Sequence, residues 1–263
     1  MPAGAQHLLR VCADPNNLPF SNNAGEGFEN RLAELLARDL QAALEYHWWP
    51  QRKSSIALSL DQNECDVLMG VPTALDSVLV TKPYYRSTYV FVSRRDRRLN
   101  VTSLSDPRFS DWRIGIHVVG DDYAPPAQAL ARRGLSGNLV GFSLFGAEGE
   151  RDPAAKLVDA VAHGDVDVAI AWGPLAGYFA QHETQPLDVV PVSPSMFMAV
   201  PFTYEISAAV RKNDRERKAE LDNLLTRECA AIQLLLAEYG VPVEKEGQPK
   251  CDASQPLRSA LSR

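Results

Sequence analysis

The sequence predicts an α/β protein built on parallel strands, and two observations lead to this class. The chain opens with an apolar run at 8–12 of strand length, a loop rich in proline and asparagine, and a helical apolar stripe at 28–40. Segments of strand and helix character then continue to alternate along the chain. Strand, polar loop and helix form the first step of a parallel sheet, in which ligands bind beyond the carboxyl ends of the strands.

The remaining elements follow from apolar periodicity and from turn residues. The segment at 84–93 stands out as a long strand, because it alternates and is rich in β-branched and aromatic residues. A helix at 218–239 is expected to end at Gly240, followed by Pro242. Other strands are expected at 42–53, 66–70, 113–119, 139–144, 166–171 and 187–192, and other helices at 127–133 and 152–162.

Composition excludes several classes of function. A chain of 263 residues with 45% hydrophobic content can bury one large core or two moderate ones. The net charge of −6 gives no reason to expect a nucleic-acid partner. No run of 18 apolar residues exists, so no membrane-spanning helix is expected, and the opening residues MPAGAQHLLR lack the apolar segment of a signal peptide.

The four cysteines permit disulfides without specifying a pairing. Cys12, Cys65, Cys229 and Cys251 lie far apart, and no metal-binding spacing links them to a histidine. An even number of cysteines suits an oxidising compartment, whereas buried free thiols at Cys12 and Cys229 remain the alternative. Neither a metal site nor a particular pair is predicted.

No catalytic constellation is evident. The sequence contains no nucleophile elbow of the form G-x-S-x-G and no H-E-x-x-H zinc motif. A triad of Ser87 or Ser143 with His117 can be imagined, but nothing in the spacing distinguishes these serines from others. The chain is therefore not expected to be an enzyme.

One motif resembles a known family. The segment DPNNLPF, followed by a spacer and GFENRLAEL, resembles the opening of type II periplasmic solute-binding proteins. The similarity is closer to binding proteins encoded beside quinoprotein alcohol dehydrogenases, which include the J proteins of methanol dehydrogenase operons and binders of pyrroloquinoline quinone (PQQ). It covers roughly residues 8–243.

This resemblance implies a two-lobed α/β fold with a central cleft and two strands that cross a hinge, the first at 84–93 and the returning one at 196–211. Lobe one is expected at 1–93 and 204–263, and lobe two at 94–203. The protein is expected to be a periplasmic monomer whose leader has been removed. It would hold no cofactor of its own and would serve either an ABC transporter in the membrane or a quinoprotein dehydrogenase.

The sequence departs from the amino-acid binders of this fold at the ligand clamp. Asn17 replaces their aromatic residue, no arginine follows the strand at 66–70, and Trp172 stands in place of the aspartate that holds the ammonium group. Free amino acids are therefore not the expected ligand. Asp121 and Asp122 would repel carboxylates at the start of the following helix, so any anionic groups of the ligand are expected elsewhere.

A planar carboxylated ligand fits the residues that replace the clamp. Trp172 and the tyrosines offer flat rings for stacking, and two cations flank the tyrosines. PQQ is the candidate ligand, and the alternative is a maturation partner that binds a dehydrogenase rather than a small solute. The expected ligand-binding residues are Asn16, Asn17, Phe20, Thr73, Lys82, Tyr84, Tyr85, Arg86, His117, Trp172 and Gly173.

Overall fold

The opening strand, loop and helix form as predicted. The computed structural model describes residues 7–50, 56–119, 122–146, 150–244 and 248–251, and it begins with strand β1 (Leu8–Ala13) and helix α1 (Phe28–Asp39). Between them the loop contains a small hairpin of strands β2 (Asn16–Asn17) and β3 (Ser21–Asn22). The apolar stripe of α1 is buried, which is the reason why this segment is helical.

The chain divides into two compact units. Unit 1 comprises residues 1–86, 205–238 and 245–263, and unit 2 comprises residues 87–204 and 239–244. The division differs from the expected one because Ser87 and Thr88 already bond within unit 2: the Ser87 hydroxyl donates to the carbonyl oxygen of Pro242, and the Thr88 hydroxyl to that of Phe202. The six residues 239–244 also belong to unit 2, which was not anticipated.

Unit 1 is built on a mixed sheet. β1 lies between β4 (Ala43–Trp48) and β5 (Val67–Pro72) and runs parallel to both. β15 (Thr203–Val210), within its unit 1 part, pairs antiparallel with β5 and with β6 (Leu79–Val80). A disulfide joins Cys12 of β1 to Cys65, directly before β5, and so ties two neighbouring strands together.

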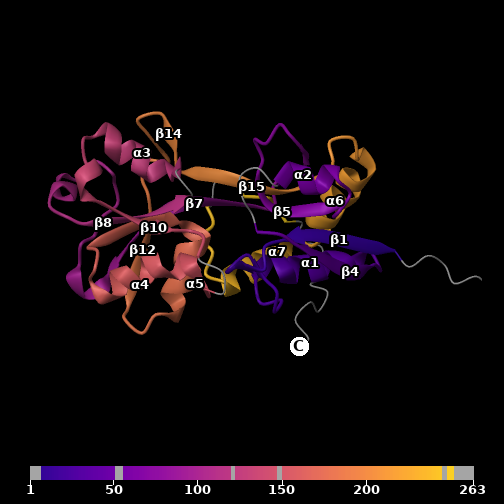
Figure 1. The fold of residues 1–263 in the computed structure, drawn as a ribbon, viewed down its shortest axis with the longest axis horizontal. Coiled ribbons are helices and arrows are strands. Elements are labelled where there is room, and N and C mark those ends of the chain that lie inside the picture. Colours follow the sequence, from indigo (N-terminus) through magenta and orange to yellow (C-terminus); the bar gives the residue numbers. More distant parts are fainter. Residues whose placement is uncertain (1–6, 51–55, 120–121, 147–149, 245–247, 252–263) are drawn as a thin grey trace, which may run out of the picture. The chain divides into compact units, whose positions relative to one another are not determined.

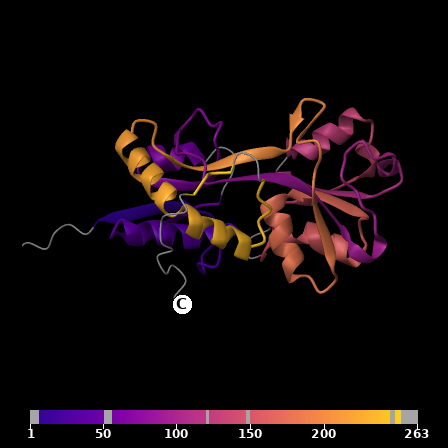
Figure 2. The same cartoon turned by 180° about the vertical axis from the view of Figure 1, so that it is seen from behind.

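Helices pack against the sheet of unit 1. α1 contacts β4, α6 (Arg215–Arg227) and α7 (Cys229–Glu238), and Figure 2 shows the last two from behind in gold. α2 (Ile56–Asp61), which the sequence analysis did not predict, contacts β5. The predicted helix at 218–239 is two helices with a break at Glu228, and a second disulfide, Cys229–Cys251, joins the start of α7 to residues near the end of the chain.

Unit 2 contains a second mixed sheet. β8 (Ile114–Val119) lies parallel to β10 (Leu139–Ser143) and β11 (Val168–Trp172), and β11 pairs antiparallel with β7 (Tyr85–Arg94). β12 (Leu187–Pro191) also pairs antiparallel with β7, and the short β9 (Asp122–Tyr123) pairs with β8.

Helices cover both faces of this sheet (Figure 1). α3 (Pro125–Arg132) packs over one face, whereas α4 (Lys156–His163) and α5 (Gly173–His182) lie on the opposite face. A hairpin of β13 (Met196–Phe197) and β14 (Val200–Pro201) precedes the returning strand and contacts α3. The predicted strand at 196–211 is therefore this hairpin followed by β15. No described helix is long and apolar enough to span a membrane.

Candidate ligand-binding site

The loop after β1 is fixed by its own polar side chains. An oxygen of Asp14 accepts a hydrogen bond from the amide of Asn16 at 2.8 Å, and the Ser21 hydroxyl donates to the Asp14 carbonyl oxygen at 2.8 Å. The amide oxygen of Asn30 accepts from the amides of Asn22 and Gly27. Asn16 is exposed and Asn17 is half-buried, so this ordered loop can present polar amides to a ligand.

The start of α1 is already occupied by the loop that precedes it. The amide of Phe28 donates to the carbonyl oxygen of Pro19 at 2.8 Å, and that of Glu29 donates to the carbonyl oxygen of Phe20 at 2.8 Å. Phe20 also places its ring against Phe28, with 5.4 Å between centroids. Two of the amides that an anion would need at a helix N-terminus are therefore used.

The predicted aromatic pair lies in the core of unit 1 instead of on an open surface. Tyr84 and Tyr85 are 4% and 1% exposed. The Tyr84 hydroxyl donates to Glu29 at 3.4 Å and accepts from the amide of Gly70 at 3.1 Å, while Tyr85 packs edge-on against Phe28. The two rings also pack against each other, with 5.1 Å between centroids. Neither ring is exposed enough for a ligand to stack on it.

Glu29 is the carboxyl group that the sequence analysis overlooked. It is only 5% exposed at the beginning of α1, and burial raises its pKa to about 8, against the opposing effect of the Tyr84 hydrogen bond. The carboxyl group is therefore largely protonated at pH 7. A glutamate in the first turn of a helix normally indicates a solvated charge, so its sequence position gave no signal of burial.

The remaining candidates of unit 1 differ in exposure. The Thr73 hydroxyl donates to the carbonyl oxygen of Glu205 at 3.1 Å and is thus engaged. Lys82 has an exposed side chain, and its amide donates to Asp222 at 2.6 Å. Arg86 is half-buried, and its carbonyl oxygen accepts a hydrogen bond from the Gln248 amide at 2.6 Å.

His117 is a buried structural residue of unit 2. It is 5% exposed, and its Nε2 lies 3.1 Å from the carbonyl oxygen of Ala154. Burial lowers the pKa of the imidazole to about 4, so the ring is neutral at pH 7 and cannot supply a cation for a carboxylate. The imagined triad does not form, because the Ser87 and Ser143 hydroxyls donate to the carbonyl oxygens of Pro242 and Phe145.

Trp172 belongs to an aromatic cluster at the carboxyl end of β11. Its indole is half-buried and lies 5.4 Å from the ring of Tyr89 and 5.9 Å from that of Tyr204. The interplanar angles of 61° and 73° show that neither tyrosine stacks parallel to the indole. The partnership with Tyr89 arises from the pairing of β7 and β11, in which Tyr89 is the register partner of Trp172.

Gly173 serves packing within unit 2. A Cβ at this position would fall 2.5 Å from the Thr88 carbonyl oxygen and 2.9 Å from the ring of Pro242. The glycine therefore lets α5 begin directly against β7 and the segment 239–244, and the space beside it is filled by protein. Its predicted place in a ligand surface receives no support from this geometry.

Among the described residues, no group of three or more histidine, cysteine, aspartate or glutamate side chains is arranged to hold a metal ion. Asp121 and the side chain of Asp122, which bear on the expected position of anionic groups, lie outside the described part of the chain.

Comparison with known proteins decides the family. Residues 9–231 match the family model described as bacterial extracellular solute-binding proteins, family 3. The chain belongs to this family. It is 32% identical over 250 residues to protein MoxJ of Methylorubrum extorquens, covering 89% of this chain and 81% of that protein. It is 31% identical over 252 residues to protein MoxJ of Paracoccus denitrificans, covering 89% and 88%.

Solved structures agree with this assignment. The periplasmic binding protein XoxJ from Methylobacterium extorquens AM1 superposes with a TM-score of 0.74 at 34% identity, covering 91% of this chain and 100% of that one. MxaJ from Methlophaga aminisulfidivorans gives a TM-score of 0.76 at 27% identity, covering 90% and 100%. The predicted resemblance to J proteins and the two-lobed type II fold of this solute-binding family are both confirmed.

Proposed function

We propose that the chain is a periplasmic binding protein that captures a planar, carboxylated aromatic ligand, with PQQ as the candidate, and serves a quinoprotein dehydrogenase. The observation that carries this proposal is Trp172, a half-buried indole at the carboxyl end of β11. It replaces the aspartate with which relatives of this fold hold an amino group. The two disulfides also suit an oxidising compartment such as the periplasm.

The aromatic cluster supports a flat ligand on physical grounds. Edge contacts with two inclined tyrosines restrict the orientation of the indole, so little side-chain entropy is lost when a ring stacks on it. Offset stacking contributes about 0.5–1.5 kcal/mol beyond the burial of area. Since His117 is neutral, it cannot pair with the carboxylates of the ligand, which would depend on lysine or arginine side chains instead.

The test is a titration of the purified protein with PQQ, followed by calorimetry and by tryptophan fluorescence. One-to-one binding with quenching is expected, and Trp172→Ala should weaken it by about 1–3 kcal/mol. Trp49→Ala is the matched control, because Trp49 lies in unit 1, is 46% exposed and contacts none of this aromatic cluster. The absence of both heat and quenching at micromolar PQQ would rule out the ligand.

A second candidate function is binding of the dehydrogenase itself, and one observation favours it. The β13–β14 hairpin exposes Met196, at the start of β13, by 59%, and Met198, in the turn, by 48%. Met198 and Ala199 have positive φ angles of 49° and 60°, which are costly for residues other than glycine. Methionine side chains adapt to varied protein surfaces, so a hairpin that exposes two of them, one in a strained turn, suits protein contact.

Co-purification with a quinoprotein dehydrogenase tests this second role. The double variant Met196→Ser with Met198→Ser should reduce capture at least tenfold while leaving the PQQ titration unchanged. The matched control is Leu234→Ser, which removes a 48% exposed apolar side chain from unit 1. Equal losses from the hairpin variant and the control would indicate no specific contact at the hairpin.

A further inference from the structure

Unit 1 contains a cavity of about 340 Å³ whose lining includes no residue of the aromatic cluster of Trp172. Its lining comes from three segments: the connection between β6 and β7, the region where α6 ends and α7 begins, and residues 249–250. All of these segments belong to unit 1. The volume is within the range of about 300–1,000 Å³ typical of small-molecule pockets.

The lining segment near the end of the chain is held in place at three points. The side-chain amide of Gln248 donates to the carbonyl oxygen of Arg86 at 2.6 Å, and the side-chain amide of Gln233 donates to the carbonyl oxygen of Pro249 at 3.3 Å. The third attachment is the disulfide between Cys229 and Cys251. A segment fixed in this way loses little entropy when a ligand contacts it, so the cavity is preorganised.

Two lysines are among the residues that line this cavity. Lys82 comes from the β6–β7 connection and Lys250 from the fixed segment. Among the described residues, neither ammonium group has a hydrogen bond or ion-pair partner. The nearby carboxylate of Asp222 is already compensated, because it accepts from the Lys82 amide at 2.6 Å and from the ammonium group of Lys218 at 2.5 Å.

The other polar groups of the lining are committed elsewhere. The Thr226 hydroxyl donates to the Asp222 carbonyl oxygen at 2.7 Å, and the Tyr84 hydroxyl donates to Glu29. The other side chains of the lining are apolar and include those of Leu225 and Pro83. A sugar or an amino acid needs several donors and acceptors together, and the lining does not offer them.

We infer that this cavity binds a small organic acid, with its anionic head group between Lys82 and Lys250 and its apolar body against Leu225. Two ammonium groups attract a carboxylate, and the apolar lining accommodates a ring or a short chain. The lining shares no residue with the aromatic cluster of Trp172, Tyr89 and Tyr204. The segment 249–250, which the Cys229–Cys251 disulfide attaches to α7, forms part of the lining.

The probe is naphthalene-1-carboxylate, titrated into the full chain by calorimetry beside the neutral 1-naphthalenemethanol. The acid is expected to bind at least tenfold more tightly than the alcohol. Lys82→Ala and Lys250→Ala should each weaken binding of the acid about five- to twentyfold. Lys212→Ala is the matched control, because this exposed lysine of unit 1 donates to the Asp76 carbonyl oxygen and does not line the cavity.

A second arm tests the fixed segment. The double variant Cys229→Ser with Cys251→Ser should weaken acid binding at least threefold, while circular dichroism verifies that the chain remains folded. Equal binding of acid and alcohol, an equal effect of Lys212→Ala, or no heat at millimolar acid would each overturn the inference. PQQ binding that depends on Trp172 would persist in Lys250→Ala, which separates this site from the proposed function.

Discussion

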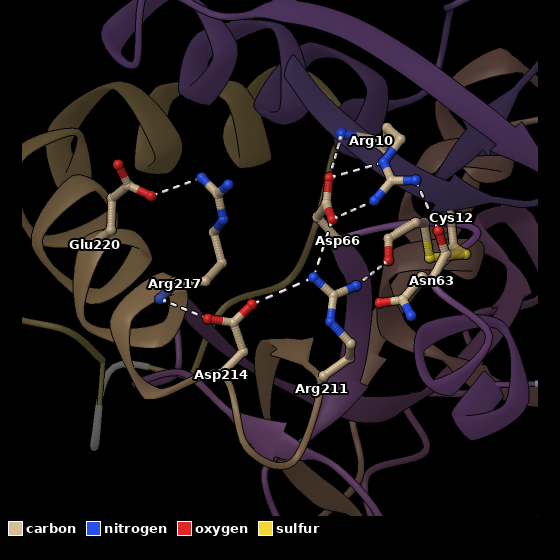
Figure 3. Close-up of polar contacts among 9 residues, drawn as sticks. Arg10, Cys12, Asn63, Asp66, Arg211, Asp214, Arg217 and Glu220 are labelled. Carbon is tan, nitrogen blue, oxygen red and sulfur yellow. Dashed lines mark hydrogen bonds and ion pairs between the residues drawn. A yellow bond between two sulfur atoms is a disulfide. The ribbon is translucent and has the colours of Figure 1, made fainter. Parts of the chain in front are cut away.

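The carboxylate of Asp66, directly before β5, accepts a hydrogen bond at 3.1 Å from the guanidinium of Arg211, directly after β15 (Figure 3). The same carboxylate also accepts two hydrogen bonds from the guanidinium of Arg10, in β1, at 3.1 and 2.8 Å. One buried carboxylate thus joins three strands of unit 1. Arg211 continues the network to Asp214, whose side chain caps α6 by accepting from the Arg217 amide.

Asp66→Asn is expected to destabilise unit 1 by about 1–3 kcal/mol, the range for hydrogen bonds that involve charged groups. Burial opposes ionisation of Asp66, but the hydrogen bonds from Arg10 and Arg211 outweigh it and hold its pKa below the usual range. The carboxylate therefore stabilises the fold above the unfolded pKa, and this contribution is lost as pH falls through the folded pKa. Urea unfolding at pH 7 and at pH 3 measures both effects.

Asp188→Asn supplies the control for this network. Its ion pair with Arg95 leaves the arginine side chain 65% exposed, and such surface pairs contribute about 0–1 kcal/mol. A similar loss of stability for Asp66→Asn and Asp188→Asn would show that the Asp66 network contributes no more than an exposed pair.

Glu29 predicts an unusual loss of stability toward alkaline pH. Its folded pKa of about 8 exceeds an unfolded value of about 4.3, so the folded state binds the extra proton between these two values. The stability that it contributes is present below about pH 4.3 and decreases by up to about 1.4 kcal/mol per pH unit until about pH 8. Glu29→Gln imitates the protonated group and should abolish this component.

The measurement is the difference in unfolding free energy between wild type and Glu29→Gln at pH 5.5 and at pH 8. The unfolding free energy of Glu29→Gln relative to that of the wild type should increase as pH rises. A constant difference across this range would mean that Glu29 ionises normally in the folded protein.

His117 predicts the opposite dependence in unit 2. Its folded pKa of about 4 lies below an unfolded value of about 6.5. The neutral ring therefore contributes stability above about pH 6.5 that is lost as pH falls toward 4. His117→Gln should remove this acid-sensitive component, and NMR titration of the imidazole should show no protonation above pH 5. Protonation near pH 6.5 in the folded state would contradict the buried hydrogen bond to Ala154.

The local pattern of apolar residues predicted many helices and strands, whereas the contacts between them depend on tertiary packing. The period of the apolar residues identified α1 and the strands β1 and β5, because burial on one face leaves a direct imprint on sequence. The break at Glu228 left no such imprint, since the apolar residues continue on both sides of it. The cap at Asp214 was visible in the sequence and would have placed the start of α6 earlier.

The candidate site was less predictable for the same reason. Tyr84 and Tyr85 were expected to face a ligand, but both side chains are buried. The burial of a residue in or beside a strand depends on the segments that pack over it, which local sequence does not show. The contact of Trp172 with Tyr89 depends on strand register, and the two disulfides join residues 53 and 22 positions apart. None of these pairings can be read from local sequence.

The segment 239–244 supplies the last prediction, because it lies in unit 2 although the chain on both sides of it belongs to unit 1. It packs on α5, where Tyr239 stacks on Tyr178 and the Gly240 carbonyl oxygen occupies the space that a side chain at Gly177 would need. Gly177→Ala should therefore displace the segment and cost about 1–3 kcal/mol, as overpacking of a filled interior does. Gly137→Ala is the control, since a Cβ there meets nothing within 4 Å and the backbone is not left-handed. Hydrogen exchange at residues 239–244 should increase in Gly177→Ala alone, and unchanged protection together with unchanged unfolding would show that α5 does not hold this segment.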